Sequence, residues 1–454
     1  MRLVTATFVS LIAAAMPAVA DQAFPAKLAG HAIIPAQTFF DPPSDASKDL
    51  AISGKFTATD KKRIDAVGSV MGTSFISAAG APRETGVKLP FKGQPMQGLS
   101  GIKSNGDGTY WTLQDNGYGA KVNSADAMLV LHRLKPDWAT GKVEKLQTIF
   151  LHDPDRKIPF QITFEGSEKR YLTGADLDVE SFQPIAGSLW IGDEFGPYLI
   201  RTDMTGKVTG FFETQIDGKP ARSPDHYSVS TPSVPGGAVA FNVRRSRGYE
   251  GMAASKDGKF LYPLLEGPLW NEEKKAWETE EGREYLRILE FDVAQEKWTG
   301  RFWKYRLEIN NNNIGDFNMI DATTGLIIER DNGEGEAWQA CTGPAKPDCF
   351  NDAAKMKRIY KIEMNDANAG GFVRKIGHID LMAIKDTDKK ARQGSKEGIF
   401  TFPFVTIEDV DVVDDRHIIV ANDNNLPYSS GRALGKQDDN EMILLEVAEF
   451  LKSK

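Results

Sequence analysis

The sequence predicts an all-β fold, a six-bladed β-propeller with loop insertions on one face. A short motif recurs along the chain, each copy contains strands joined by tight turns, and an acid recurs at similar offsets. One copy is the stretch Arg247–Trp270, where the turn residues Asp257 and Gly258 separate two apolar runs. An Asp-Gly pair between such runs predicts a hairpin. Glu250 opens the first run and Glu266 follows the second, so both acids are expected at the same edge of a sheet.

The first twenty residues have the pattern of a secretory signal peptide. One basic residue, Arg2, precedes the apolar run Leu3–Met16, and the small-x-small motif Ala18–Ala20 follows it. A membrane anchor is the weaker interpretation, because the run is shorter than the roughly 20 apolar residues that cross a bilayer. We therefore expect residues 1–20 to be cleaved, and the protein to be periplasmic or secreted with no membrane span after cleavage.

The chain remaining after cleavage is expected to form a single propeller domain over residues 21–454. Its formal charge is negative, −8 for the whole chain, which argues against nucleic acid or an anionic membrane surface as partner. The two cysteines, Cys341 and Cys349, are expected to form a disulfide in an exported protein. The alternative, a two-thiolate metal site, has no histidine nearby to support it.

Five copies of the motif follow one another from Gly98 onward. Their opening positions lie 80, 70, 66 and 92 residues apart, at Ser100, Glu180, Glu250, Asp316 and Glu408. A closing acid follows 13 to 16 residues later in each copy, at Asp115, Asp193, Glu266, Asp331 and Asp423. A near-constant inner spacing within a variable outer one is typical of a repeat with insertions. About 70 residues per copy leaves room for six blades.

Each copy is predicted to hold at least three strands. In chain order they are 98–102, 110–113 and 128–134; 177–182, 188–192 and 198–202; 250–254, 260–265 and 286–293; 315–320, 326–330 and 358–363; and 405–410, 417–421 and 441–447. The sixth blade is assigned either to the N-terminal region or to Thr209–Ser246. Ala32–Phe40 is the candidate strand for closing the ring by pairing with the last blade. The alternative fold is a β-sandwich or two smaller sheets.

Three insertions stand between a closing acid and the third strand of its copy: Asn271–Tyr285, Asn332–Lys357 and Asn425–Asn440. If the copies are blades, all three insertions lie on one face of the disc. Because loops on a rigid scaffold commonly carry function, we expect this face to be the functional one.

Acids at the start of the innermost strands would meet at the channel mouth. Two carboxylates about 6 Å apart repel by roughly 3 kcal/mol at an effective dielectric near 20, so a group of them must be protonated, paired or bound to a cation. Oxygen ligands without His or Cys favour Ca²⁺. The predicted metal ligands are Glu180, Asp193, Glu266, Asp331 and Asp423. Glu250 and Glu408 are predicted to be catalytic, and substrate binding is assigned to Arg247, Lys121, Arg330 and Asn116.

Each acid taken alone has a plainer interpretation, as a strand cap, a turn residue or a salt-bridge partner. The recurrence at similar offsets favours a shared functional role. Other catalytic signatures are absent from the sequence: there is no G-x-S-x-G motif, no Walker loop and no dinucleotide fingerprint. Ser100 has no evident His partner.

Six stretches resemble the exported phytase-like family, often labelled "esterase-like activity of phytase". They are GLSGI (98–102), DVES (178–181), RGYEG (247–251), EGPLW (266–270), RILEFD (287–292) and IEDVDVVDDRHIIVANDNN (407–425). The resemblance runs from about Gly98 to Val447 and implies a six-bladed propeller that hydrolyses phosphate or carboxylic esters. The family's Asp-Pro-Glu-Gly stands here as Asp178–Ser181, and its C-terminal Glu-Gly as Glu408-Asp409, so both acids are kept while the neighbouring turn residues differ.

Together these observations predict an exported Ca²⁺-dependent hydrolase acting on a small phosphate or carboxylic ester at an acidic channel mouth. Two alternatives remain open from the sequence. One is a non-catalytic propeller that binds a ligand or protein on the same face, and the other is a sugar-lactone hydrolase.

Overall fold

The computed structural model describes residues 22–454, and the predicted signal peptide lies outside this range. Regular structure in the described chain is almost entirely β. Its α-helix, α1 (Ala448–Lys452), is a short C-terminal segment. The 3-10 turns are η1 (Lys48–Ala51), η2 (Lys121–Asn123), η3 (Ala337–Gln339) and η4 (Asp366–Asn368). The all-β prediction is thus confirmed.

Twenty of the strands form five antiparallel units of four strands each, numbered here 1 to 5. The first strands are β9 (Leu99–Ser104), β13 (Val179–Ile185), β19 (Tyr249–Ala254), β26 (Asn313–Met319) and β33 (Ile407–Val412). The second strands are β10 (Tyr110–Gln114), β14 (Ser188–Asp193), β20 (Phe260–Leu265), β27 (Thr324–Arg330) and β34 (His417–Asn422). The third strands are β11 (Val130–Asp137), β15 (Tyr198–Asp203), β24 (Arg283–Asp292), β28 (Lys357–Glu363) and β35 (Asn440–Glu446). The fourth strands are β12 (Lys142–Phe150), β16 (Val208–Glu213), β25 (Lys297–Arg306), β29 (Arg374–Asp380) and β2 (Lys27–Ile34).

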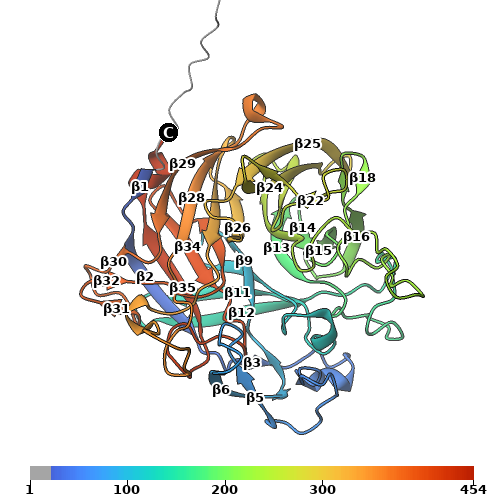
Figure 1. Ribbon diagram of the computed structural model, residues 1–454, viewed down its shortest axis with the longest axis horizontal. Coiled ribbons are helices and arrows are strands. Elements are labelled where there is room, and N and C mark those ends of the chain that lie inside the picture. The colour runs from blue at the N-terminus through green and yellow to red at the C-terminus, as the bar shows by residue number, and fades with distance from the viewer. Residues whose placement is uncertain (1–21) are drawn as a thin grey trace, which may run out of the picture.

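Five hydrophobic cores lie between consecutive units, joining 1 to 2, 2 to 3, 3 to 4, 4 to 5 and 5 to 1. The sequence of strand β34 is apolar almost throughout because the strand packs against a neighbouring unit on each face. Ile418 and Val420 pack toward unit 4, whereas Ile419 and Ala421 pack toward unit 1, because alternate side chains of a strand point to opposite faces. The first strands also contact one another in this cyclic order, and β9, β13 and β26 lie near the middle of the molecule (Figure 1).

Glycines allow the first strands to approach closely. A Cβ on Gly315 would lie 2.3 Å from the carbonyl oxygen of Ile407, and one on Gly251 would lie 2.8 Å from that of Gly315. Such distances exclude any side chain at these two positions without movement of the neighbouring backbone. The glycines of the repeated motif therefore permit backbone-to-backbone packing of units 3, 4 and 5.

Five units are found among residues 22–454, not the six predicted from length. Unit 5 packs directly on unit 1, since Ile419 and Met442 share a core with Leu99 and Val130, and this contact leaves no place for another unit between them. Neither region assigned to a sixth blade forms one. Strand β16, at the start of Thr209–Ser246, completes unit 2, and the N-terminal region supplies the last strand of unit 5.

That last strand, β2, pairs antiparallel with β35. An N-terminal strand was predicted to pair with the last blade, but at Ala32–Phe40, and the observed strand begins five residues earlier at Lys27. A further strand, β1 (Gln22–Phe24), pairs parallel with β29 of unit 4. The N-terminus thus ties two neighbouring units together.

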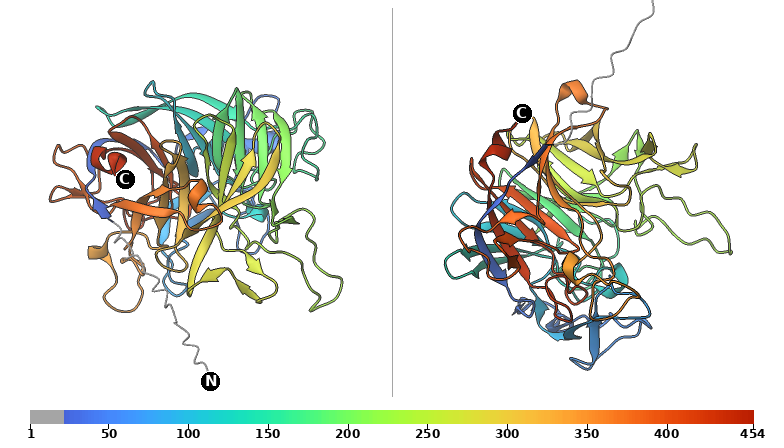
Figure 2. Two further views of the ribbon diagram at one scale, coloured as in Figure 1. Left: turned by 90° about the horizontal axis from the view of Figure 1, so that it is seen from above. Right: turned by 60° about the vertical axis from the view of Figure 1, so that its left-hand side comes forward.

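The remaining strands are short and belong to connections. They are β3 (Phe39–Phe40), β4 (Ile52–Ser53), β5 (Val70–Thr73), β6 (Glu84–Leu89), β7 (Phe91–Lys92), β8 (Gln94–Pro95), β17 (Gln215–Ile216), β18 (Lys219–Pro220), β21 (Trp270–Asn271), β22 (Ala276–Trp277), β23 (Thr279–Glu280), β30 (Ile384–Lys385), β31 (Ser395–Lys396) and β32 (Ile399–Phe400). In antiparallel units, first strands begin at the end where second and fourth strands finish. The three predicted insertions and the unit-to-unit connections therefore share one face, from which long loops project (Figure 2).

The segment before unit 1 packs against these loops. Buried Arg83 pairs with buried Glu334 in the insertion of unit 4 and donates to the carbonyl oxygen of Cys349 at 3.2 Å. Thr85 donates its hydroxyl to the carbonyl oxygen of Pro427 in the insertion of unit 5 at 2.8 Å. Ionic and polar contacts with loops far apart in sequence thus hold the N-terminal segment on the loop face.

The predicted disulfide is confirmed. Cys341 and Cys349 are bonded, with Cα atoms 5.1 Å apart. Replacing both with serine is expected to lower the free energy of unfolding by about 2–3 kcal/mol, because the unfolded chain regains the freedom of the short loop. Denaturant unfolding of the variant and of the wild type would measure the difference. Equal stabilities would contradict the prediction, and reduction of the wild type serves as an independent check.

Candidate metal and active site

Each first strand has a bulge near its start, and the bulges lie at the repeated acidic positions. Pairing is regular up to Val179, Tyr249 and Ile407 and then shifts by one residue. The extra residues in these three units are Glu180, Glu250 and Glu408. A bulge turns its extra residue out of the ladder and is common beside functional sites. The recurring acids are therefore presented by a recurring irregularity of the backbone.

The pairing register also identifies the equivalent positions in the other units. The residues directly after the last regular pair are Ser100, Glu180, Glu250, Gly315 and Glu408, in units 1 to 5. Across the hairpin, the residues that follow the paired position are Asp115, Glu194, Glu266, Arg330 and Asp423. Ten equivalent positions thus contribute seven carboxylates and one guanidinium group at one end of the first strands.

Asp178 and Arg247 add to this group. Asp178 stands just before β13, and one of its carboxylate oxygens lies within 4.8 Å of one from Glu180. Arg247 contacts Glu266 and reaches solvent, with one third of its side chain exposed. The resulting set, called the acid cluster below, consists of Asp115, Asp178, Glu180, Glu194, Glu250, Glu266, Glu408, Asp423, Arg247 and Arg330.

In one half of the acid cluster, the acids form no ion pair with a basic side chain of residues 22–454. One carboxylate oxygen from each of Asp178, Glu180 and Glu194 lies within 4.8 Å of the other two. Asn116 donates to Asp178 Oδ2 at 2.7 Å, while Asp178 Oδ1 is buried with no hydrogen-bond partner among the described residues. These three buried carboxylates offer only oxygen atoms as metal ligands, and one of those oxygens has no hydrogen bond. Such a group suits a hard cation such as Ca²⁺.

The other half contains the two arginines. Arg330 Nη2 lies 2.8 Å from Glu408 Oε1 and 4.0 Å from Glu250 Oε1. Ser100 donates its hydroxyl to the second oxygen of Glu408 at 3.1 Å, which links unit 1 to unit 5. Glu408 is therefore held at both oxygens.

The pKa values of the acids show that the cluster is one electrostatic unit. Burial, followed by the charge on Asp178, raises the pKa of Asp115 to about 8. Burial raises the pKa of Asp178 to about 6. The pKa values of Glu180, Glu194, Glu250 and Asp423 are raised well above their usual range, by burial first and then by other acids of the cluster. The charge of Glu408 contributes to the shifts of acids in four units, so it lies centrally.

Seven of the residues assigned to the site from sequence meet in the acid cluster: Glu180, Glu250, Glu266, Glu408, Asp423, Arg247 and Arg330. Asn116 lies beside it and holds Asp178. Asp193, a predicted metal ligand, instead accepts from the backbone N–H groups of Asp178 and Gly196 at 2.8 and 2.6 Å. It therefore shapes the turn that carries Glu194.

The other two assigned residues make different contacts. Asp331 accepts from the backbone N–H groups of Lys355 and Met356 and pairs with buried Lys357 at 2.9 Å. Asp331 thus holds the insertion of unit 4 in place. The position in the cluster that is predicted for Asp331 is occupied by its neighbour Arg330. The ammonium group of Lys121 lies 5.9 and 5.8 Å from the ring centres of Phe160 and Phe195, so its observed contacts are aromatic.

Sequence reasoning left Asp178 and Glu194 out of the assigned site. Glu194 directly follows Asp193. If the closing position is defined by its place opposite the bulge, and not by its distance from the turn, it falls on Glu194. Asp178 lies just before the strand, and its place beside Glu180 depends on the bulge, which spacing does not reveal.

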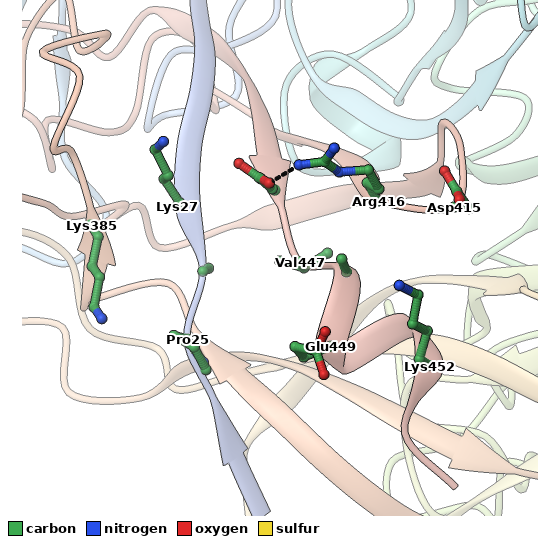
Figure 3. Close-up of a pocket in the computed structure, with 11 residues that line it drawn as sticks. Pro25, Lys27, Lys385, Asp415, Arg416, Val447, Glu449 and Lys452 are labelled. Atoms are coloured by element: carbon green, nitrogen blue, oxygen red, sulfur yellow. Dashed lines mark hydrogen bonds and ion pairs between the residues drawn. The ribbon is translucent and has the colours of Figure 1, made fainter.

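A separate surface hollow lies beside the C-terminal helix (Figure 3). Its volume is about 630 Å³, and its lining includes Lys27, Lys385, Arg416 and Lys452. None of the lining residues belongs to the acid cluster. The hollow is therefore a different feature from the candidate site.

A family model described as "Phytase-like: Esterase-like activity of phytase" matches residues 94–426. The chain belongs to this phytase-like family. Membership confirms the resemblance seen in the sequence. No helix within residues 22–454 has the length and apolar character needed to cross a membrane.

One curated relative and two solved structures are similar to this phytase-like chain. An uncharacterized secreted protein of Arthroderma benhamiae is 24% identical over 246 residues, which are 42% of this chain and 46% of that protein. The chain thus spans about half the length of that relative. Regucalcin, a calcium-binding protein from Agrobacterium tumefaciens, has a TM-score of 0.33 at 12% identity, covering 78% of this chain and 92% of its own. A putative 6-phosphogluconolactonase from Bacteroides fragilis has a TM-score of 0.29 at 10% identity, covering 78% and 86%. TM-scores this low carry no argument about this chain.

The raised pKa of Asp115 predicts an unusual pH dependence of stability in chelator. An unfolded aspartate titrates near pH 4, whereas the folded group titrates at about 8. Between these values the folded state binds more protons, so this group's contribution to stability falls as the pH rises. Asp115→Asn removes the titration, and Asn can still accept the Gly117 N–H bond seen at 2.8 Å. The melting temperature of the variant should therefore rise relative to the wild type between pH 5 and pH 8. If calorimetry shows a difference in melting temperature between variant and wild type that stays constant from pH 5 to pH 8, the prediction is contradicted.

Proposed function

We propose that the protein is an exported, cation-dependent hydrolase of phosphate or carboxylic esters, with the acid cluster as its active site. The observation that carries the proposal is the convergence of eight carboxylates and two guanidinium groups at the bulged ends of five strands. We further propose that residues 21–454 form one domain, a closed propeller of five blades. Family membership supports hydrolysis in general.

The two halves of the cluster suit different tasks. Asp178, Glu180 and Glu194 would hold a Ca²⁺ ion, which when bound supplies Lewis-acid polarisation of the ester or phosphate oxygen. Arg247 connects the cluster to solvent and would meet the negative charge of an incoming substrate. Arg330 lies deeper and would stabilise charge that develops during the reaction.

Glu408 is the better of the two predicted catalytic acids for the role of general base. Ser100 and Arg330 fix the positions of its oxygens, and the guanidinium group of Arg330 favours its ionised form, against the burial that raises its pKa. In this role Glu408 takes the proton of the attacking water. Glu250 lies farther from Arg330, at 4.0 Å, and groups with Glu194 and Glu266.

Substitution of Glu408 tests the proposal directly. Glu408→Gln should lower turnover by about 10²-fold or more, the usual contribution of a general base, and chelator should abolish turnover by the wild type. A panel of aryl phosphates, aryl esters and lactones would identify the substrate class. Exposed Glu273 lies on the same face outside the cluster, and Glu273→Gln is the matched control.

Unchanged turnover in Glu408→Gln would refute the assignment of the base. Calcium binding without turnover of any substrate in the panel would instead support a ligand-binding protein. Turnover confined to the lactones would support the sugar-lactone alternative.

A further inference from the structure

The acid cluster contains two groups of three carboxylates that share one residue. Asp178, Glu180 and Glu194 form the first trio, and Glu194, Glu250 and Glu266 form the second. Within each trio, one oxygen of every member lies within 4.8 Å of the others. Because Ca²⁺ binds oxygens at about 2.3–2.6 Å, oxygens on opposite sides of one ion lie about 5 Å apart. Each trio therefore has the spacing to surround its own ion, and Glu194 stands between them.

Each trio also contains a buried oxygen with no hydrogen-bond partner among residues 22–454. These atoms are Asp178 Oδ1 in the first trio and Glu250 Oε1 in the second, on residues that are 2% and 5% exposed. Leaving a buried polar atom unsatisfied costs about 1–3 kcal/mol. The two unsatisfied atoms occur one per trio, as expected if each trio lacks a ligand of its own.

The net charge of the acid cluster also favours two cations over one. The eight carboxylates and two arginines of the cluster sum to −6 when fully ionised. One divalent cation leaves −4, and two leave −2. Arg247 and Arg330 already lie on the Glu250 and Glu266 side, but Arg330 also pairs with Glu408. The arginines therefore do not neutralise the second trio by themselves.

We propose that Glu194 bridges two hard divalent cations, one held with Asp178 and Glu180 and the other with Glu250 and Glu266. This inference rests on the proposed function and adds a second ion to it. Two ions that share a carboxylate form a clamp that can bind both oxygens of a phosphate or both the ester oxygen and the attacking water. Glu250 is then a ligand, and proton transfer is left to Glu408.

The number of bound ions tests this arrangement. Chelator-treated protein at pH 8 is titrated with Ca²⁺ in a calorimeter, and the ions bound per chain are counted by native mass spectrometry. Two ions are expected for the wild type and for the control Glu273→Gln. Asp178→Asn and Glu250→Gln should each retain one, and Glu194→Gln should weaken both by about tenfold or more. Circular dichroism and melting curves verify folding, and the Asp178 and Glu250 variants suffice if Glu194→Gln does not fold.

The outcomes separate this inference from the function on which it rests. One ion in the wild type, with turnover that still requires it, overturns the bridged pair and leaves the hydrolase standing. Loss of both ions in Asp178→Asn, together with two ions retained in Glu250→Gln, also overturns the bridged pair. No bound ion, with turnover that persists in chelator, overturns both.

Discussion

Mutual repulsion among buried carboxylates is the constraint on which the rest of the structure depends. At about 5 Å and an effective dielectric near 20, two ionised acids repel by about 3 kcal/mol, and eight acids share one end of the central strands. Hydrophobic packing must therefore hold in place a set of charges that would otherwise separate. The five cores between consecutive units do this, since each unit is fixed on both of its faces.

Polar contacts between neighbouring first strands reinforce that packing close to the acids. Gly101 donates its N–H to Asp409 of unit 5 at 3.1 Å, and Asn318 of unit 4 donates to the carbonyl oxygen of Val410 at 2.7 Å. Gln183 of unit 2 donates to the carbonyl oxygen of Met252 in unit 3 at 2.6 Å. Rigid support of this kind keeps acids close together without the freedom to relax, which is how a protein preorganises a charged site.

The sequence predicts the repeat, the strands and most of the cluster because these depend on local pattern. It misplaces residues where the answer depends on pairing register. Spacing predicts Asp316 as the opening position of unit 4, but pairing places Gly315 there. Spacing likewise selects Asp193, one residue before Glu194, and Asp331, one residue after Arg330. A bulge adds one residue to one strand, and its exact place is set by hydrogen bonding between strands, which spacing alone does not reveal.

The prediction of six units is wrong for a related reason. Dividing the chain by the repeat length treats every residue as part of a blade, but the segment from Pro35 to Gln97 forms short strands that fasten loops instead. Buried Arg83 shows the difference, because its partners Glu334 and Ser430 belong to the insertions of units 4 and 5. A buried arginine in an otherwise irregular segment indicates a long-range ionic contact, although its partner cannot be read from the sequence.

The asymmetry of the cluster follows from unit 4. This unit supplies Gly315 and Arg330 where units 2 and 3 supply Glu180 with Glu194 and Glu250 with Glu266. One repeat thus contributes a positive charge and a glycine to a ring whose other positions, apart from Ser100, are acidic. Arg330 pairs with Glu408, while the unit 2 acids Asp178, Glu180 and Glu194 form a group of their own. Divergence of a single repeat therefore divides one ring of carboxylates into an arginine-paired side and a side that suits cations.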